Sequence, residues 1–134
     1  MIKSEKEIVS EFFKIVRSGK EIKRASEFMA EKVIAHQVQA ENEYSVTRSP
    51  QDYSDHVQEM LDEYGDFSLE IQEILADRAK VYVRWRQIGE SENGEEVIEI
   101  ASAVYLVRDG KIVEYWIQID RKGLELQKKD RESK

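Results

Sequence analysis

The stretch DGKIVEYWIQID, residues 109–120, is composed almost entirely of strand-forming residues. It opens on Asp109-Gly110, a pair that favours tight hairpin turns because both central residues take positive φ. Two sets of side chains then alternate: Val113, Tyr115, Ile117 and Ile119 on one face, and Ile112, Glu114, Trp116 and Gln118 on the other. Both sets are bulky, so neither face is expected to be freely exposed. The strand ends on Asp120, and this carboxylate either caps the strand end or lies at the floor of a pocket.

Length and composition restrict the class of protein. The 134 residues favour one domain, residues 1–134, with a core that needs no disulfides. The net charge of −7 argues against nucleic acid or an anionic membrane as a partner. The absence of cysteine excludes disulfides, thiolate zinc sites and a cysteine nucleophile. No stretch resembles a secretory signal or a membrane span, so a cytoplasmic location is expected.

Apolar periodicity divides the chain into a helical first half and a strand-rich second half. Ser4 with Glu7, and later Ser49-Pro50, are helix-start signals. The expected helices cover residues 4–18, 21–29 and 50–64, and the expected strands cover residues 33–40, 67–75, 79–89, 95–107 and 111–119. Residues 41–48 are expected to form a polar connection, and residues 121–134 a charged, partly frayed tail. Helices followed by an antiparallel meander indicate an α+β fold.

Two-residue turns at Asn93-Gly94 and Asp109-Gly110 predict the register of the last three strands, with Trp85 opposite Ser102. One face then carries Val81, Val83, Trp85, Ile98, Ile100, Val104, Leu106, Val113, Tyr115, Ile117 and Ile119. The other face carries Tyr82, Arg84, Arg86, Glu99, Ala101, Ala103, Tyr105, Glu114, Trp116, Gln118 and Asp120. The first face requires burial against helices or another subunit.

The second face mixes aromatic and charged side chains, and two interpretations stay open. It is either a half-exposed surface with cross-strand ion pairs such as Arg86 with Glu99, or a cavity with a few polar groups directed inward. In the cavity interpretation, Arg84 and Arg86 clamp an anionic substrate. In the surface interpretation, they balance Glu99 and Glu114.

The closing stretch also carries a family resemblance. Asp109, Gly110, Lys111, Ile112, Val113, Glu114, Trp116, Asp120, Gly123 and Leu124 resemble the closing motif of the SnoaL-like polyketide cyclases, DGKIxExWxxxDxxGL. The segments VYVRWRQIGE and SAVYLVRDGKIVEYW are also similar to strands of that family. The resemblance implies the nuclear transport factor 2-like fold, in which a cone-shaped curved antiparallel sheet wraps around N-terminal helices. It further implies a pocket at the open end and a homodimer formed through the sheet.

The resemblance also implies the site residues. In the cyclases, an aspartate that matches Asp120 acts as acid and base in an intramolecular aldol ring closure, and a histidine that matches His36 lines the pocket. His36 alternates with Ile34 and Val38, so it projects into the pocket or takes a hydrogen-bonded structural position. The expected catalytic residues are therefore Asp120 and His36. The expected substrate-binding residues are Tyr82, Arg84, Arg86, Tyr105, Trp116 and Gln118.

No metal and no cofactor are expected. His56 shares a helix with Glu59 and Glu63, but no HExxH motif is present, so a solvated helix edge is expected there. The sequence contains neither a phosphate-binding glycine loop nor a nucleophile elbow.

These features favour a small cofactor-free enzyme that acts on a hydrophobic carbonyl compound by general acid/base catalysis at Asp120. The alternative is a non-catalytic dimeric module that binds a small hydrophobic molecule. The short loop at residues 90–96 and the lack of a second pocket histidine favour that alternative. A third interpretation is an isomerase or epoxide hydrolase in which Arg86 bridges Glu99 and Asp120.

Overall fold

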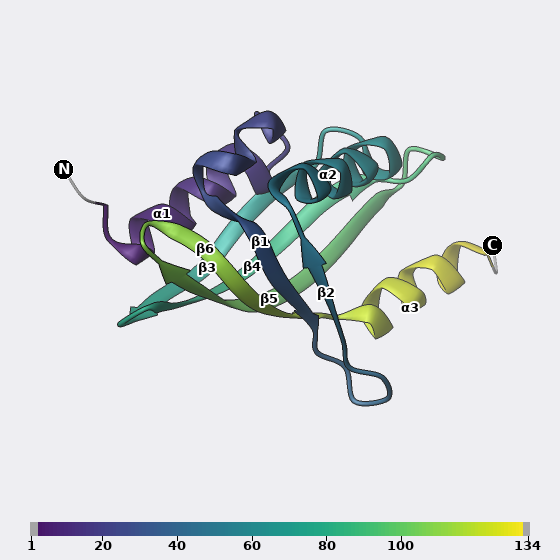
Figure 1. The fold of residues 1–134 in the computed structure, drawn as a ribbon. Coiled ribbons are helices and arrows are strands. Elements are labelled where there is room, and N and C mark those ends of the chain that lie inside the picture. Colours follow the sequence, from purple (N-terminus) through teal and green to yellow (C-terminus); the bar gives the residue numbers. More distant parts are fainter. Residues whose placement is uncertain (1–2, 133–134) are drawn as a thin grey trace.

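The structure is a curved six-stranded sheet with helices α1 and α2 packed on one of its faces (Figure 1). The computed structural model describes the backbone of residues 3–132 and the side chains of residues 3–128. Its helices are α1 (Glu5–Phe12), the π-helix η1 (Phe13–Arg17), the 3₁₀-helix η2 (Ile22–Glu27), α2 (Pro50–Tyr64) and α3 (Arg121–Glu132). Its strands are β1 (Met29–Gln37), β2 (Tyr44–Arg48), β3 (Ser68–Asp77), β4 (Lys80–Glu90), β5 (Glu96–Arg108) and β6 (Lys111–Ile119). The predicted α+β architecture is confirmed.

The first helix starts as predicted and then changes its pitch. The side chain of Ser4 accepts the amide of Glu7, and the side chain of Glu7 accepts the amide of Ser4, which is a capping box. The chain continues into η1, where the amide of Ser18 donates to the carbonyl of Phe13 at 3.0 Å. Such a π-turn holds one more residue than an α-helical turn. Gly19, at φ 84°, then ends the helix.

The predicted helix at residues 50–64 is confirmed as α2. The side chain of Ser49 accepts the amide of Asp52, and Pro50 occupies the first helical position, where its missing N–H group is no loss. Tyr53 and Val57 are buried against the sheet side of the helix. The apolar stripe of the sequence therefore becomes the face that covers the sheet.

The strand order is β2-β1-β6-β5-β4-β3, and neighbouring strands are antiparallel except β1 and β6, which run parallel. The prediction of a polar connection at residues 41–48 is wrong, because residues 44–48 form β2 and pair with β1. The predicted second helix is shorter, since β1 already begins at Met29. Strands β2 and β3 leave the sheet with two open edges.

The charged tail forms α3 over the described residues 121–132, where a partly frayed segment was predicted. Helix α3 lies against β5 beyond the end of β6, whose last paired residue, Ile119, is opposite Ala101. The side-chain amide of Gln127 donates to the carbonyl of Ile98 at 2.7 Å, and its oxygen accepts the amide of Ile98 at 2.9 Å. Gln127 thus satisfies backbone groups that no strand pairs there. Residues 133 and 134 lie outside the described residues.

The core fills the space between α1, η1, α2 and the inner face of the sheet, which is the face that these helices cover. Phe12 lies at its centre and is 0% exposed. The centroid of its ring lies 5.2–6.3 Å from those of four other rings, in Phe13, Phe28, Tyr53 and Tyr105. Aromatic packing of this kind contributes a large part of the stability of a small domain.

The predicted register of β4 with β5 is wrong by one residue. Trp85 pairs with Ala101, because the chain between Glu90 and Glu96 is a five-residue loop instead of a two-residue turn. The predicted turn at Asp109-Gly110 is confirmed by φ angles of 51° and 77°. A bulge close to this turn shifts the register of β5 with β6 as well. Because side chains alternate along a strand, the slip places Ala101, Ala103 and Tyr105 on the inner face.

Candidate functional site

The corrected register divides the predicted substrate-binding residues between the two faces of the sheet. Tyr105 lies on the inner face and is 1% exposed. The other five lie on the outer face: Tyr82, Arg84, Arg86, Trp116 and Gln118. Arg86 binds Glu70 of β3 at 3.2 Å, whereas Glu99 faces inward. The predicted bridge from Arg86 to Glu99 and Asp120 is therefore wrong.

Asp120 lies between β6 and α3, and it caps the helix. Its Oδ1 accepts the amide of Gly123 at 2.9 Å, and its own amide donates to the carbonyl of Ile100 at 2.9 Å. Residue 123 has to be small, since a Cβ there would lie 2.1 Å from Oδ2 of Asp120. The side chain of Asp120 is exposed. This geometry fits the capping alternative.

Replacing Asp120 with alanine is expected to lower the free energy of unfolding by about 1 kcal/mol, because the amide of Gly123 loses its acceptor. Asp120→Asn is expected to recover most of that loss, since asparagine is also a good cap. Urea denaturation of both variants measures the difference. Equal stability of Asp120→Ala and the wild type would contradict the capping role.

His36 lies on the outer face of the sheet, where β1 pairs with β6. Its ring stacks on that of Trp116, with centroids 5.1 Å apart and an interplanar angle of 13°. Its two ring nitrogens contact Ser45 and Glu114. The two residues predicted to be catalytic therefore belong to different local structures. His36 is part of a cluster on the outer face, and Asp120 caps α3.

A buried polar cluster occupies the inner face. We call it the inner polar cluster, and it consists of Arg17, Trp85, Gln87 and Glu99. Arg17 of η1 is 5% exposed, and its Nη2 lies 4.0 Å from Oε2 of Glu99. Its guanidinium carbon lies 5.7 Å from the ring centroids of Trp85 and Phe67, so two aromatic rings flank it. Gln87 is 2% exposed and pairs with Glu99 across β4 and β5.

Three atoms of this cluster are buried without a hydrogen-bond partner among the described residues: Nη1 of Arg17, Nε1 of Trp85 and Oε1 of Gln87. The two nitrogens are donors and the oxygen is an acceptor. A buried donor or acceptor that stays unpaired costs about 1–3 kcal/mol. Buried polar groups are normally paired, so three unpaired atoms in one cluster make it a candidate site for a bound polar group.

The carboxyl group of this cluster has an altered acidity. Burial raises the pKa of Glu99, Arg17 opposes that shift, and Glu63 adds to it. Tyr64 belongs to the same environment, since burial, Glu63 and Glu99 raise the pKa of its phenol to about 12. A raised pKa brings a carboxyl group closer to the range in which it both takes up and returns a proton.

A groove of about 790 Å³ opens between the end of α2, the β4–β5 loop and α3, and we call it the α2–α3 groove. Its lining comprises Glu63, Tyr64, Ser91, Glu92, Asn93, Glu95, Val97, Leu124, Glu125, Gln127 and Lys128. The inner polar cluster lies beside this groove, because Val97 lines the groove and Glu99 is the next residue of β5 that faces inward; no member of the cluster is itself a lining residue. Gly89 pairs with Val97 and lets α2 come close, since a Cβ there would lie 2.8 Å from Cβ of Tyr64.

The lining of the α2–α3 groove disfavours an anionic ligand. It includes four glutamates and one lysine, Glu63, Glu92, Glu95, Glu125 and Lys128. An excess of negative charge repels anions. Apolar contacts are available from Tyr64, Val97 and Leu124. A small molecule with hydrophobic parts and an uncharged polar group fits this combination.

His56 is half-buried, so the prediction of a solvated helix edge is wrong. Its ring centroid lies 6.2 Å from that of Tyr53. Burial, followed by the charges of Arg48 and Arg17, lowers its pKa to about 4, and its imidazole is therefore neutral at neutral pH. Among the residues that the structure describes, no group of three or more histidine, aspartate or glutamate side chains is placed to hold a metal ion.

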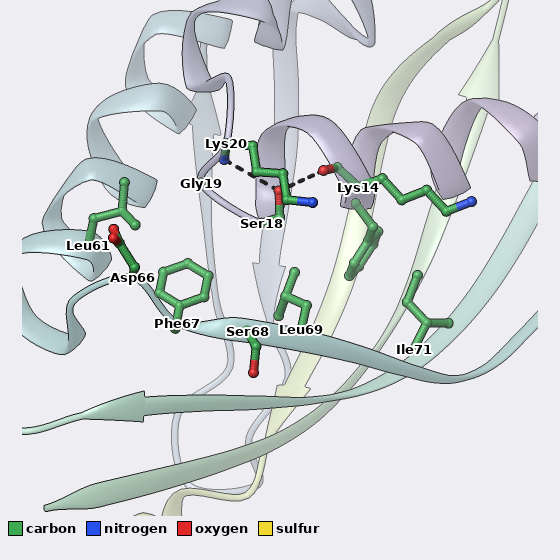
Figure 2. Close-up of a pocket in the computed structure, with 11 residues that line it drawn as sticks. Lys14, Ser18, Gly19, Lys20, Leu61, Asp66, Phe67, Ser68, Leu69 and Ile71 are labelled. Carbon is green, nitrogen blue, oxygen red and sulfur yellow. Dashed lines mark hydrogen bonds between the residues drawn. The ribbon is translucent and has the colours of Figure 1, made fainter.

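Figure 2 shows another groove, of about 540 Å³, between η1 and the start of β3. Phe67, Leu69 and Ile71 lie on its strand side, and Lys14 and Lys20 lie on its helix side. None of its lining residues, all of which are described, carries a buried side-chain atom without a partner. The α2–α3 groove beside the inner polar cluster is therefore the stronger candidate.

The fold and this site define a small α+β protein with a groove between α2, the β4–β5 loop and α3. The family model of the SnoaL-like polyketide cyclases matches residues 7–128. The chain belongs to this family, as the closing motif predicted. A comparison with curated protein sequences gives no match.

Solved structures confirm the nuclear transport factor 2-like fold. A candidate polyketide cyclase from Acidithiobacillus ferrooxidans is 20% identical with a TM-score of 0.78, over 95% of this chain and 96% of that one. IdmH of Streptomyces antibioticus, a candidate polyketide cyclase, is 19% identical with a TM-score of 0.78, over 93% and 98%. An LEH-like epoxide hydrolase of M. tuberculosis is 18% identical with a TM-score of 0.70, over 91% and 90%. At these identities the likeness shows the fold alone.

Within the described residues, none of the helices combines the length and the apolar character needed to cross a membrane.

Proposed function

We propose that this protein binds a small, neutral, hydrophobic carbonyl compound in the α2–α3 groove and acts on it by general acid/base catalysis without a cofactor. The observation that carries the proposal is Glu99, an inward-facing carboxyl group with a raised pKa beside the buried guanidinium of Arg17. Membership of the cyclase family supports carbonyl chemistry. The excess of glutamates along the groove argues against an anionic substrate.

In the proposed reaction, Glu99 takes a proton from the carbon next to a carbonyl group, and the electron pair moves onto the carbonyl oxygen. The unpaired N–H groups of Arg17 and Trp85 are suitable donors to that oxygen as its charge grows. The enolate carbon then attacks a second carbonyl group of the same molecule, and Glu99 returns its proton to the new alkoxide. A carbon–carbon bond forms, and no oxidant or reductant is required.

Asp120, with His36 as an assisting group, remains an alternative for the acid/base role. The geometry favours Glu99, because one oxygen of Asp120 already accepts the amide of Gly123 and its side chain is exposed. His36 is similarly engaged with Ser45 and Glu114 on the outer face. Glu99 is more enclosed and lies beside the unpaired donors.

The test is solvent-deuterium exchange at the carbon next to the carbonyl, screened by NMR over hydrophobic ketones and diketones. We expect exchange for at least one compound, and we expect Glu99→Gln to slow it about 100-fold, the usual contribution of a general base. Asp120→Asn is the matched control and should exchange at the wild-type rate. A loss of exchange that is confined to Asp120→Asn would show that Asp120, and not Glu99, is the base.

The aromatic side chains that fill the inner face favour a second candidate function, that of a non-catalytic module that binds a small hydrophobic molecule. The space deeper than the inner polar cluster is occupied by the rings of Phe12, Phe13, Tyr53, Tyr105 and Tyr115. A ligand would then stay in the α2–α3 groove, away from Glu99. A hydrophobic molecule that co-purifies and is unchanged after long incubation, together with no exchange in the screen, would support this candidate.

We also propose a homodimer formed through the outer face of the sheet. Ile100 of β5 and Leu75 of β3 are 44% and 56% exposed there. Both side chains are apolar and lie on the same face as Tyr82. Sedimentation velocity at micromolar concentration is expected to show a dimer, and Ile100→Asp is expected to shift it to monomer. A wild-type chain that stays monomeric would contradict the proposal.

A further inference from the structure

Three side chains on the outer face form a continuous chain of short polar contacts, and we call them the outer relay: Ser45, His36 and Glu114. Nδ1 of His36 lies 2.5 Å from Oγ of Ser45, and Nε2 lies 2.6 Å from Oε2 of Glu114. The residues come from the neighbouring strands β2, β1 and β6, and His36 is directly opposite Ser45. Regular strand pairing therefore holds the three groups in place.

The carboxylate determines which ring nitrogen carries the hydrogen. A carboxylate only accepts hydrogen bonds, so Nε2 of the neutral imidazole carries the hydrogen and donates it to Glu114. Nδ1 is then an acceptor, and the hydroxyl group of Ser45 donates to it. This order of groups is that of a nucleophile, a base and the acid that orients the base.

Packing encloses His36 and Glu114 and leaves Ser45 accessible. The side chains of His36 and Glu114 are 18% and 24% exposed, and His36 stacks on Trp116. Ser45 is exposed on the edge strand β2, at the opposite edge of the sheet from Leu75 of β3. Ile34 is 42% exposed on the same face as His36, and it adds apolar surface beside the relay.

We propose that Ser45 is a nucleophile toward small neutral esters, with His36 as its base and Glu114 as the residue that positions the base. Oγ of Ser45 attacks the ester carbonyl carbon while Nδ1 of His36 takes the hydroxyl proton. The bond to the leaving alcohol breaks, and that alcohol receives the proton from His36. Water then releases the acyl group by the same route, which yields a carboxylic acid and free Ser45. This site is separate from the α2–α3 groove.

The experiment treats the full-length protein with a fluorophosphonate probe and locates adducts by peptide mass mapping. We expect one adduct, on Ser45, and none on that peptide in Ser45→Ala. His36→Phe keeps a ring to stack on Trp116 but removes both nitrogens, and it is expected to slow labelling about 100-fold. Glu114→Ala is expected to slow labelling too, and Glu114→Gln, which keeps an acceptor for Nε2–H, should restore most of the rate.

Ser102 supplies the matched control, because it lies on the same face, on β5, opposite Gln118 and Arg84. Ser102→Ala should label at the wild-type rate. Glu99→Gln should also label normally, so that failure of the groove chemistry and failure of the outer relay are distinguishable. Equal labelling of Ser45 in His36→Phe and the wild type, or adducts spread over Ser45 and Ser102 alike, would overturn the proposal. Circular dichroism confirms that each variant is folded.

Discussion

Phe12→Ala is expected to lower the free energy of unfolding by about 3–5 kcal/mol, the usual effect of removing a buried phenylalanine ring. Phe12 has 0% exposure, and its ring contacts the rings of Phe13, Phe28, Tyr53 and Tyr105. These neighbours lie in η1, the turn after η2, α2 and β5, so they cannot all move into the space that the ring leaves. The cavity therefore persists and its cost adds to the loss of apolar burial.

Urea denaturation followed by tryptophan fluorescence measures this effect. Leu126→Ala on α3 is the matched control, because Leu126 is 48% exposed. That variant is expected to change the stability by less than about 0.5 kcal/mol. A loss below about 1 kcal/mol for Phe12→Ala would show that the ring is not central to the core.

Arg17→Met is expected to destabilise the protein by about 3–5 kcal/mol near pH 8, because it leaves the carboxylate of Glu99 without its buried partner. The side chains of Arg17 and Glu99 are 6% and 14% exposed, so water screens neither of them well. Methionine retains much of the aliphatic length of arginine, so the change isolates the loss of charge.

The size of this loss should depend on pH. Burial raises the pKa of Glu99 above the ordinary value of 4.5, and the variant lacks the cation that opposes this shift. The stabilising contribution of a carboxyl with a raised pKa is complete below its unfolded pKa and is lost as the pH rises through its folded pKa. Arg17→Met should therefore be less destabilising near pH 4 than near pH 8.

Two further variants control this experiment. The double variant Arg17→Met/Glu99→Gln removes both charges and should recover a large part of the stability. Arg24→Met removes an exposed arginine that pairs with Glu21 and Glu27, and it should have little effect. The same loss at pH 4 and pH 8, or no recovery in the double variant, would contradict a buried charge pair.

The parts of the fold that carry strong local signals were predictable. The capping box at Ser4, the Pro50 helix start and the Asp109-Gly110 turn all depend on neighbouring residues, and each is present in the structure. Strand β2 carries only a weak signal, because it is five residues long and its alternation rests on two residues, Tyr44 and Val46. Helix α3 depends on the tertiary contact of Gln127 with β5, which no local pattern reveals.

The candidate site was less predictable, because it depends on register. The loop between β4 and β5 has five residues where a two-residue turn was expected, so each side chain of β5 lies on the opposite face of the sheet from the one predicted. Glu99 therefore lies on the inner face, with Trp85, and not on the face of Arg84 and Arg86. Arg17 was not predicted as a site residue, because it follows Val16 at the end of an apolar stripe, where a cationic side chain normally reaches solvent. Its spacing of four from Phe13 was the one available signal, because that spacing returns to the same side of a helix.

The π-turn of η1 has an evolutionary consequence. A π-turn is equivalent to an α-helix into which one residue has been inserted, and the flanking segments keep their orientation. A relative with one residue fewer and a regular helix would hold its equivalents of Phe12 and Arg17 in the same places. An alignment with such a relative needs a one-residue gap between Phe13 and Arg17, and without that gap the buried cation would be misread as a substitution.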